Sequence, residues 1–389
     1  MNKRIKIALI TLNDANDKKS WSGTLYNISK SLQEYCGDVY YIEPFSSFRN
    51  RSLKNVLFLF NYLLEKIFKK GYVYTFNQLL CKNLSRYVEN NLEGKKFDLI
   101  FAPAGSSELA FLNTKLPVVY LSDSTFNLLF GSENRYIINP LDISLKEGNY
   151  IEKLAIDKSD MIIYSSKWAA DSAIGDYSAD ESKIHIVPFG ANIEEIPSKE
   201  LVNLKKKENY CNLLFLGVDW KSKGGEIVFE TLLELENYGF DARLTVCGCT
   251  PPKEFFHEKM EVIPFLDKND EKQSKQLFNL FFKSDFLFLP TRNDAFGIVF
   301  CEANAFGLPV ITTDTGGVSG VIEQGKNGFM LPLSANASDY AKLIHEIFLD
   351  DERYKELVNS SRKIFDKKLN WDSWGLEVSK LIYHNIIYK

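Results

Sequence analysis

Two acidic residues, Asp294 and Glu302, lie eight positions apart around a glycine turn in RNDAFGIVFCEANAFGLPVITTDTGG, residues 292–317. The apolar runs 285–290 and 308–314 on either side predict two neighbouring strands of a parallel sheet, buried on both faces. The residues between them predict a turn and a short helix, which the following Gly-Leu-Pro ends. Because a loop entering a helix presents unpaired backbone amides, this turn is a natural seat for an anion.

Length and composition set limits on the function. A chain of 389 residues predicts two or three domains, and 45% apolar with 25% charged residues is ordinary for a globular protein. The formal net charge of −4 leaves no overall basic footprint, which argues against a nucleic-acid-binding protein. Six cysteines show neither a CxxC pair nor a disulfide-like spacing. We therefore expect buried thiols in a reducing, cytoplasmic setting.

Two segments raise the question of a membrane. The opening MNKRIKIALITLN predicts a strand rather than a signal peptide, because its apolar stretch is short and is followed by a polar loop. No run of about 18 apolar residues occurs, so no membrane span is expected. The segment 49–76 interleaves basic with large apolar residues. It fits either a helix lying on an anionic bilayer, at the inner face of the membrane, or a core helix with a solvated basic face.

Short apolar strands alternate with amphipathic helices in two series, separated by a polar stretch at 191–212 that we interpret as an interdomain linker. The expected strands are 5–11, 37–43, 97–103, 117–123, 161–166 and 183–189, then 211–218, 242–248, 260–265, 285–290 and 309–314. This pattern predicts an α/β chain of two doubly wound domains that face each other, 1–190 and 191–369. A helix at 370–389 either ends the second domain or crosses back to the first.

Motifs along nearly the whole chain carry a family resemblance: WSGTLYN, YSSKWAADS, IHIVPFGANIE, FLGVDWKSKGG and the 292–317 segment. With them, the chain resembles retaining glycosyltransferases of the GT-B architecture, family 4 (glycosyl transferases group 1). The family places two acidic residues eight apart around a Phe-Gly turn, and here Asp294 replaces the usual first glutamate. The resemblance implies two Rossmann-like domains around a nucleotide-sugar, and a helix at 370–389 that crosses back to the first domain.

The resemblance also implies roles for the residues around this turn. Glu302 would bind the ribose hydroxyls of the donor, and Asp294 would bind hydroxyls of its sugar. Gly316 and Gly317 would form a loop near the donor, or only a tight turn. Three backbone amides at the helix start would bind the diphosphate: those of Phe296, Gly297 and Ile298.

A diphosphate leaving group also needs cations. Lys223 matches the lysine of the family pattern, but residues 218–219 are Val-Asp where an arginine is expected. Lys221 or Arg292 could supply the missing charge. The alternatives are a solvated loop lysine for Lys221 and a structural pairing with Asp294 for Arg292.

In the first domain, two residues stand at positions where members of this family contact the donor or the acceptor. Gly23 would approach the diphosphate or the acceptor with its amide, or be a plain turn glycine. Asp123 stands at the end of a strand where family members carry a histidine. It would contact the donor sugar or acceptor, or cap the following helix. His185, one of four histidines, is expected to be an ordinary strand residue.

No D-x-D triplet occurs and histidine is sparse, so no metal or other cofactor is expected, and the nucleotide-sugar is a substrate. Catalysis would rest on positioning and on fixed dipoles aimed at the leaving diphosphate. The leading hypothesis is a transferase that acts on a glycan or lipid-linked glycan in surface polysaccharide synthesis. The alternatives are an epimerase of the same architecture and a binding protein that has lost catalysis.

Overall fold

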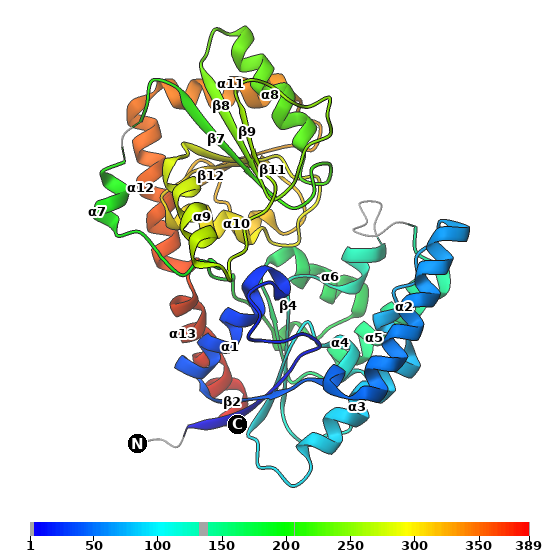
Figure 1. The fold of residues 1–389 in the computed structure, drawn as a ribbon. Coiled ribbons are helices and arrows are strands. Elements are labelled where there is room, and N and C mark those ends of the chain that lie inside the picture. The colour runs from blue at the N-terminus through cyan, green and yellow to red at the C-terminus, as the bar shows by residue number, and fades with distance from the viewer. Residues whose placement is uncertain (1–3, 132–138, 206, 389) are drawn as a thin grey trace. The chain divides into compact units, whose positions relative to one another are not determined.

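The computed structural model describes residues 4–131, 139–205 and 207–388. The chain divides into two compact units, Met1–Pro188 with Trp374–Lys389 and Phe189–Ser373. Each unit contains one six-stranded parallel sheet with helices against its faces (Figure 1). These are two Rossmann-like domains, as the two series of strands predicted.

The strands of the first unit follow the order β2-β1-β3-β4-β5-β6, and every neighbouring pair is parallel. All residues of the three strands β3, β4 and β5 are buried, which explains their continuous apolar sequences. The strands are β1 (Ile5–Ile10), β2 (Gly37–Ile42), β3 (Leu99–Pro103), β4 (Val118–Ser122), β5 (Met161–Tyr164) and β6 (Ile184–Ile186). The helices are α1 (Thr24–Tyr35), α2 (Phe48–Phe68), α3 (Gln78–Leu92), α4 (Ser106–Leu109), α5 (Asp142–Lys158) and α6 (Lys167–Tyr177).

The second unit has the strand order β12-β11-β10-β7-β8-β9, again parallel throughout. Its strands are β7 (Cys211–Leu216), β8 (Ala242–Cys247), β9 (Met260–Ile263), β10 (Phe286–Leu289), β11 (Val310–Thr313) and β12 (Gly328–Leu331). Its helices are α7 (Lys199–Asn203), α8 (Gly225–Asn237), α9 (Glu271–Lys283), α10 (Ile298–Ala305), α11 (Ala337–Leu349) and α12 (Asp351–Lys368). Strand β12 was not predicted, because it is a short edge strand that is buried over only half its length.

The stretch 191–212 is part of the second unit and not a linker. Its first amide, that of Ala191, donates to the carbonyl of Leu369 at 3.0 Å, and Val202 is buried. The ammonium of Lys205 donates to the carbonyl of Ser284. The polar sequence suggested a linker, but the apolar part of a lysine side chain can pack against a surface while its ammonium group binds a polar partner.

The last long helix, α13 (Trp371–Ile382), packs on the first unit from Trp374 onward. The Trp374 ring is 1% exposed and meets Phe101 of β3 edge-on, with ring centroids 6.4 Å apart. A Cβ on Gly375 would lie 2.4 Å from the ring of Tyr35, so α13 and α1 approach closely where the side chain is missing. The Ser379 hydroxyl donates to the carbonyl of Tyr35 at 2.9 Å. The chain therefore returns to its first unit, as the family resemblance implies.

Two carboxyl groups are fully buried in the first unit. Glu152 of α5 accepts hydrogen bonds from the Ser106 hydroxyl at 2.6 Å and the Tyr120 hydroxyl at 3.0 Å. Glu108 of α4 accepts one from Ser107 at 2.6 Å. Burial raises the pKa of each carboxyl from 4.5 to about 7. Both groups thus hold a proton at pH values where an exposed glutamate has lost it.

Helix α2 contradicts one of the two interpretations of the segment 49–76. A core helix would bury its apolar residues, but Asn50 is the buried residue of α2. Within the described part of the chain, none of the helices has both the length and the hydropathy needed to cross a membrane.

Replacing Trp374 with alanine tests the packing of α13. Loss of this buried ring should lower the free energy of unfolding by about 3–5 kcal/mol. Leu376→Ala, on the exposed side of the same helix, should change it by less than about 0.5 kcal/mol. Urea unfolding followed by far-ultraviolet circular dichroism measures both, and equal midpoints for the two variants would contradict the packing described.

Replacing Glu152 with glutamine tests the raised pKa. Between about pH 4.5 and 7 the folded protein keeps a proton that the unfolded chain releases, so stability falls as the pH rises through this window. Glutamine cannot ionise, so Glu152→Gln should show a smaller loss of unfolding free energy between pH 5 and pH 8 than the wild type. Glu93→Gln, at an exposed position, is the control and should keep the wild-type pH dependence.

Candidate active site

Three loops of the second unit leave adjacent strands at the same edge of the sheet. Residues 217–224 follow β7, residues 290–297 follow β10 and residues 314–317 follow β11. They bring together Lys223 and Asp294, whose ammonium and carboxylate oxygen Oδ2 lie 2.7 Å apart. The two side chains are 19% and 14% exposed, so this ion pair is shielded but open to a ligand.

Backbone contacts hold the Asp294 side of this pair in place. The amide of Arg292 donates to the carbonyl of Ser222 at 2.8 Å, which ties the loop after β10 to the loop after β7. The amide of Gly317 donates to the carbonyl of Asp294 at 3.0 Å. Gly316 has φ 55°, and a Cβ there would lie 2.0 Å from the same carbonyl oxygen. The two glycines predicted to lie near the donor thus fix the backbone of Asp294.

Helix α10 begins shortly after Asp294. Gly297 is its N-cap with φ 86°, and a Cβ there would collide with the ring of Phe300 at 2.3 Å. The Phe296 amide donates to Asp294 Oδ1 at a long 3.4 Å, while Ile298 is the first helical residue. The first amides of a helix carry its positive dipole end. This helix start and the Lys223 ammonium therefore lie in one corner of the unit, on either side of the Asp294 carboxylate.

Glu302 lies one turn into α10 and is 2% exposed. The ammonium of Lys268 lies 2.5 Å from its Oε1 atom and also donates to the carbonyl of Asn192 at 3.2 Å. Burial raises the pKa of Glu302, and the charge and hydrogen bond of Lys268 with a backbone hydrogen bond from Asn192 act against that rise. Lys268 therefore helps to keep a buried carboxylate ionised.

Sequence reasoning missed Lys268. It stands in the polar loop after β9, in LDKNDEK, where a lysine is expected to be solvated. Lys268 and Glu302 are thirty-four positions apart, and no sequence pattern relates two residues at that separation. Only the folded loop shows that they form a pair.

The two candidates for the missing cation differ in their surroundings. The guanidinium of Arg292 donates to the carbonyl of Leu333 at 2.7 Å, whereas the Asp294 carboxylate pairs with the lysine described above. Lys221 is exposed on the turn before α8. Val218, where the family pattern has arginine, is 74% exposed. Lys221 is thus the candidate with an ammonium on the surface beside the site.

In the first unit, the loop after β1 has an unusual backbone. Trp21, Ser22 and Gly23 have φ values of 50°, 56° and 93°, and Gly23 is the N-cap of α1. Left-handed conformations cost non-glycine residues on the order of 1–3 kcal/mol each and cluster at functional sites. A plain turn glycine does not require two such neighbours, so this loop is a second candidate site.

Asp123 meets this loop from the end of β4. Its Oδ2 atom accepts a hydrogen bond from the Trp21 indole N–H at 3.1 Å. The structure thus brings Asp123 together with the segment of Gly23, through a tryptophan that sequence reasoning did not single out. His185 lies in β6, as predicted, and burial lowers the pKa of its imidazole.

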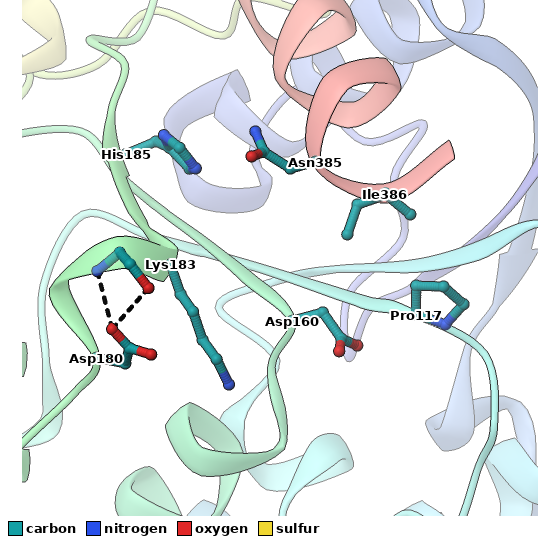
Figure 2. A pocket seen from close by; sticks show the side chains of 8 residues that line it. Pro117, Asp160, Asp180, Lys183, His185, Asn385 and Ile386 are labelled. Atoms are coloured by element: carbon teal, nitrogen blue, oxygen red, sulfur yellow. Dashed lines mark hydrogen bonds between the residues drawn. The ribbon is translucent and has the colours of Figure 1, made fainter. Parts of the chain in front are cut away.

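A pocket in the first unit lies at the opposite edge of the sheet, before strands β4, β5 and β6 (Figure 2). It is lined by Pro117, Asp160, Asp180, Ser182, Lys183, His185, Asn385 and Ile386. Its charged groups have structural partners. The Asp160 carboxylate accepts a hydrogen bond from the Val118 amide, and the Asp180 carboxylate accepts hydrogen bonds from the amide and the hydroxyl of Ser182. Lys183 donates to the carbonyl of Ser159 at 3.1 Å. We therefore place no reaction there.

All six cysteines are free thiols, and five of them are buried, as expected. In the described ranges no group of three histidine, cysteine, aspartate or glutamate side chains is arranged to hold a metal ion. Whether the reaction is independent of metal stays a prediction.

Comparison with known proteins finds a family match within the second unit. Residues 198–364 match the family model described as glycosyl transferases group 1. An uncharacterized glycosyltransferase of Methanocaldococcus jannaschii is 25% identical over 367 residues, which cover 91% of this chain and 92% of the relative. A D-inositol 3-phosphate glycosyltransferase of Corynebacterium jeikeium is 23% identical over 218 residues, and this alignment spans only 52% of each chain.

Solved structures share the fold of the whole chain. Sucrose-phosphate synthase of Thermosynechococcus elongatus superposes with a TM-score of 0.69 at 15% identity, covering 99% of this chain and 100% of the other. HepE of Anabaena, solved in complex with UDP and glucose, gives 0.64 at 14% identity, covering 98% and 100%. The segment 198–364, with its paired lysines and carboxylates, therefore belongs to the glycosyl transferases group 1, in a chain with the two-domain GT-B fold.

Proposed function

We propose that this chain is a retaining glycosyltransferase that moves a sugar from a nucleotide-sugar to a glycan or lipid-linked glycan acceptor, in surface polysaccharide synthesis. The observation that carries the proposal is the Lys223–Asp294 ion pair beside the start of α10. One cation, one carboxylate and a helix N-terminus within one corner match the phosphate and hydroxyl groups of a sugar diphosphate.

Each group of the second unit has a role in this proposal. The first amides of α10 and the Lys223 ammonium bind the diphosphate and stabilise the charge that develops as it leaves. The carboxylate of Asp294 accepts hydrogen bonds from hydroxyls of the sugar. Glu302, with its Oε1 held by Lys268, presents the other oxygen to the ribose hydroxyls. Because HepE of Anabaena was solved in complex with UDP and glucose, UDP-sugars are the first donors to test.

The surroundings of both carboxylates argue against a hydrolase that uses them as acid and nucleophile. Asp294 pairs with Lys223 and Glu302 with Lys268, so each carboxyl group already has a lysine partner. A general acid needs a carboxyl group with free access to the leaving oxygen. In the proposed reaction the departing phosphate takes the proton of the acceptor hydroxyl, and the protein contributes position and electrostatic stabilisation.

A binding protein without catalysis is the second candidate. The observation in its favour is the exposed Val218 at the position of the family arginine, while Arg292 is engaged with Leu333. Such a protein would bind the nucleotide-sugar and never release nucleoside diphosphate. An epimerase would release the sugar without an acceptor.

The first experiment measures nucleoside diphosphate release from UDP-, GDP- and ADP-sugars, with and without candidate glycan acceptors. One donor should be turned over, and Lys223→Ala should lower its turnover about a hundredfold or more, because it removes charge stabilisation from the leaving group. Glu302→Ala should mainly weaken donor binding. Lys275→Ala, an exposed lysine of α9 paired with Glu271, is the control and should behave as wild type. Donor binding without release, with every acceptor, would instead support the binding protein.

The second experiment tests Lys268 through the pH profile. The buried Glu302 binds ribose as a carboxylate, so kcat/KM falls as the pH drops through its raised pKa. Lys268→Met removes the charge that lowers this pKa, so the acid limb of the profile should move to higher pH. Lys268→Arg should restore the wild-type limb. If the acid limb of the kcat/KM profile stays in place in Lys268→Met, with unchanged thermal stability, then Lys268 does not lower the pKa of Glu302.

A further inference from the structure

Helix α2 carries an unusual amount of exposed apolar surface. It runs along the first unit beside α3 (Figure 1), and of its 21 residues Asn50 is buried. Single exposed apolar residues are normal on a protein surface, but a contiguous set marks an interaction site. The exposed large side chains of α2 are Phe48, Val56, Phe58, Leu59, Phe60, Tyr62, Leu63, Ile67 and Phe68.

Not all of these side chains lie on the outer face of the helix, because Phe58 and Phe60 contact the rings of Tyr74 and Tyr72 edge-on. Successive residues are about 100° apart, so the inner face consists of Asn50, Leu53, Leu57, Asn61 and Leu64, which are buried or half-buried. Two of the attachments on that face are polar. Asn50 donates to the carbonyl of Pro44 at 3.0 Å, and Asn61 accepts from the Tyr72 amide at 2.6 Å. The opposite face carries Phe48, Val56, Leu59, Tyr62 and Leu63, so the apolar face is the one turned away from the unit.

Basic residues stand at both ends of the apolar stretch. Between positions 48 and 70 the charged residues are Arg49, Arg51, Lys54, Lys66, Lys69 and Lys70 against the single acid Glu65. This excess is local, because the whole chain has a net charge of −4. An apolar centre with lysine and arginine at its ends fits a helix that lies in the plane of an anionic membrane surface. The long basic side chains can reach the headgroups while the apolar side chains enter the acyl boundary.

The charge also decides between the possible occupants of this face. A second copy of the chain would bring the same excess of positive charge against it, which opposes self-association. We propose that α2 docks this protein on an anionic lipid bilayer, with its outer apolar face inserted and its terminal basic residues at the headgroups. The proposal does not rest on the transferase activity, but it would place the enzyme at the surface where lipid-linked acceptors lie.

The test uses the full chain and flotation with two kinds of vesicle, pure phosphatidylcholine and an equal mixture with phosphatidylglycerol, in the absence of any donor. The wild type should bind the mixed vesicles, and added salt should weaken this binding because it screens the charges. Two triple variants separate the contributions: Val56→Ser with Leu59→Ser and Leu63→Ser, and Arg49→Gln with Arg51→Gln and Lys66→Gln. Each should bind the mixed vesicles at least about tenfold more weakly.

A matched control replaces three exposed leucines elsewhere, Leu204, Leu349 and Leu376, with serine and should bind like the wild type. Absence of wild-type binding, or equal binding by all variants, overturns the proposal. So does a serine variant that binds vesicles normally but changes from dimer to monomer on size exclusion, because the face would then contact a second copy. Donor turnover in solution should be equal in all these proteins, so a failed transferase assay leaves the vesicle result interpretable.

Discussion

The common direction of the strands in the second unit decides where its chemistry lies. Because β11, β10 and β7 are adjacent and parallel, the loops that follow them leave the sheet at one edge and must meet there. The Lys223–Asp294 ion pair is one of the contacts between two of these loops, and the third loop donates a backbone hydrogen bond to the carbonyl of Asp294. Glycine is required at 316 and 297 because the packed loops leave no space for a Cβ. If one of these strands ran antiparallel, the loop after it would lie at the other edge of the sheet, away from the other two.

Charge balance gives this site a distinct character. Each carboxylate has its own lysine, so the four groups together are nearly neutral: Lys223 neutralises Asp294, and Lys268 neutralises Glu302. In the proposed reaction, a diphosphate at the start of α10 would compete with Asp294 for Lys223. That competition would free the carboxylate oxygens of Asp294 for hydroxyls of the sugar, so donor binding would itself prepare Asp294.

The sequence predicted what depends on local pattern. Short apolar runs located the strands from β1 to β11, including β6 and β9, which are only partly buried, and the Phe-Gly turn located the start of α10. The failures have other causes. Lys268 and Trp21 act through loops that only tertiary structure brings to Glu302 and Asp123. The stretch 191–212 looked like a linker because lysine stems pack as well as apolar side chains do. In α2 the pattern showed basic and apolar residues together, but not which face is turned inward.

The first unit is discontinuous in sequence, and this has a consequence for synthesis of the protein. Its sheet is complete at β6, yet the surface of β3 at Phe101 remains uncovered until Trp374, near the end of the chain, has been made. The second unit is one continuous segment and can finish folding as soon as its last residues leave the ribosome. The first unit is therefore the first to be synthesised and the last to be completed. Its apolar surface at Phe101 stays uncovered while the second unit is translated.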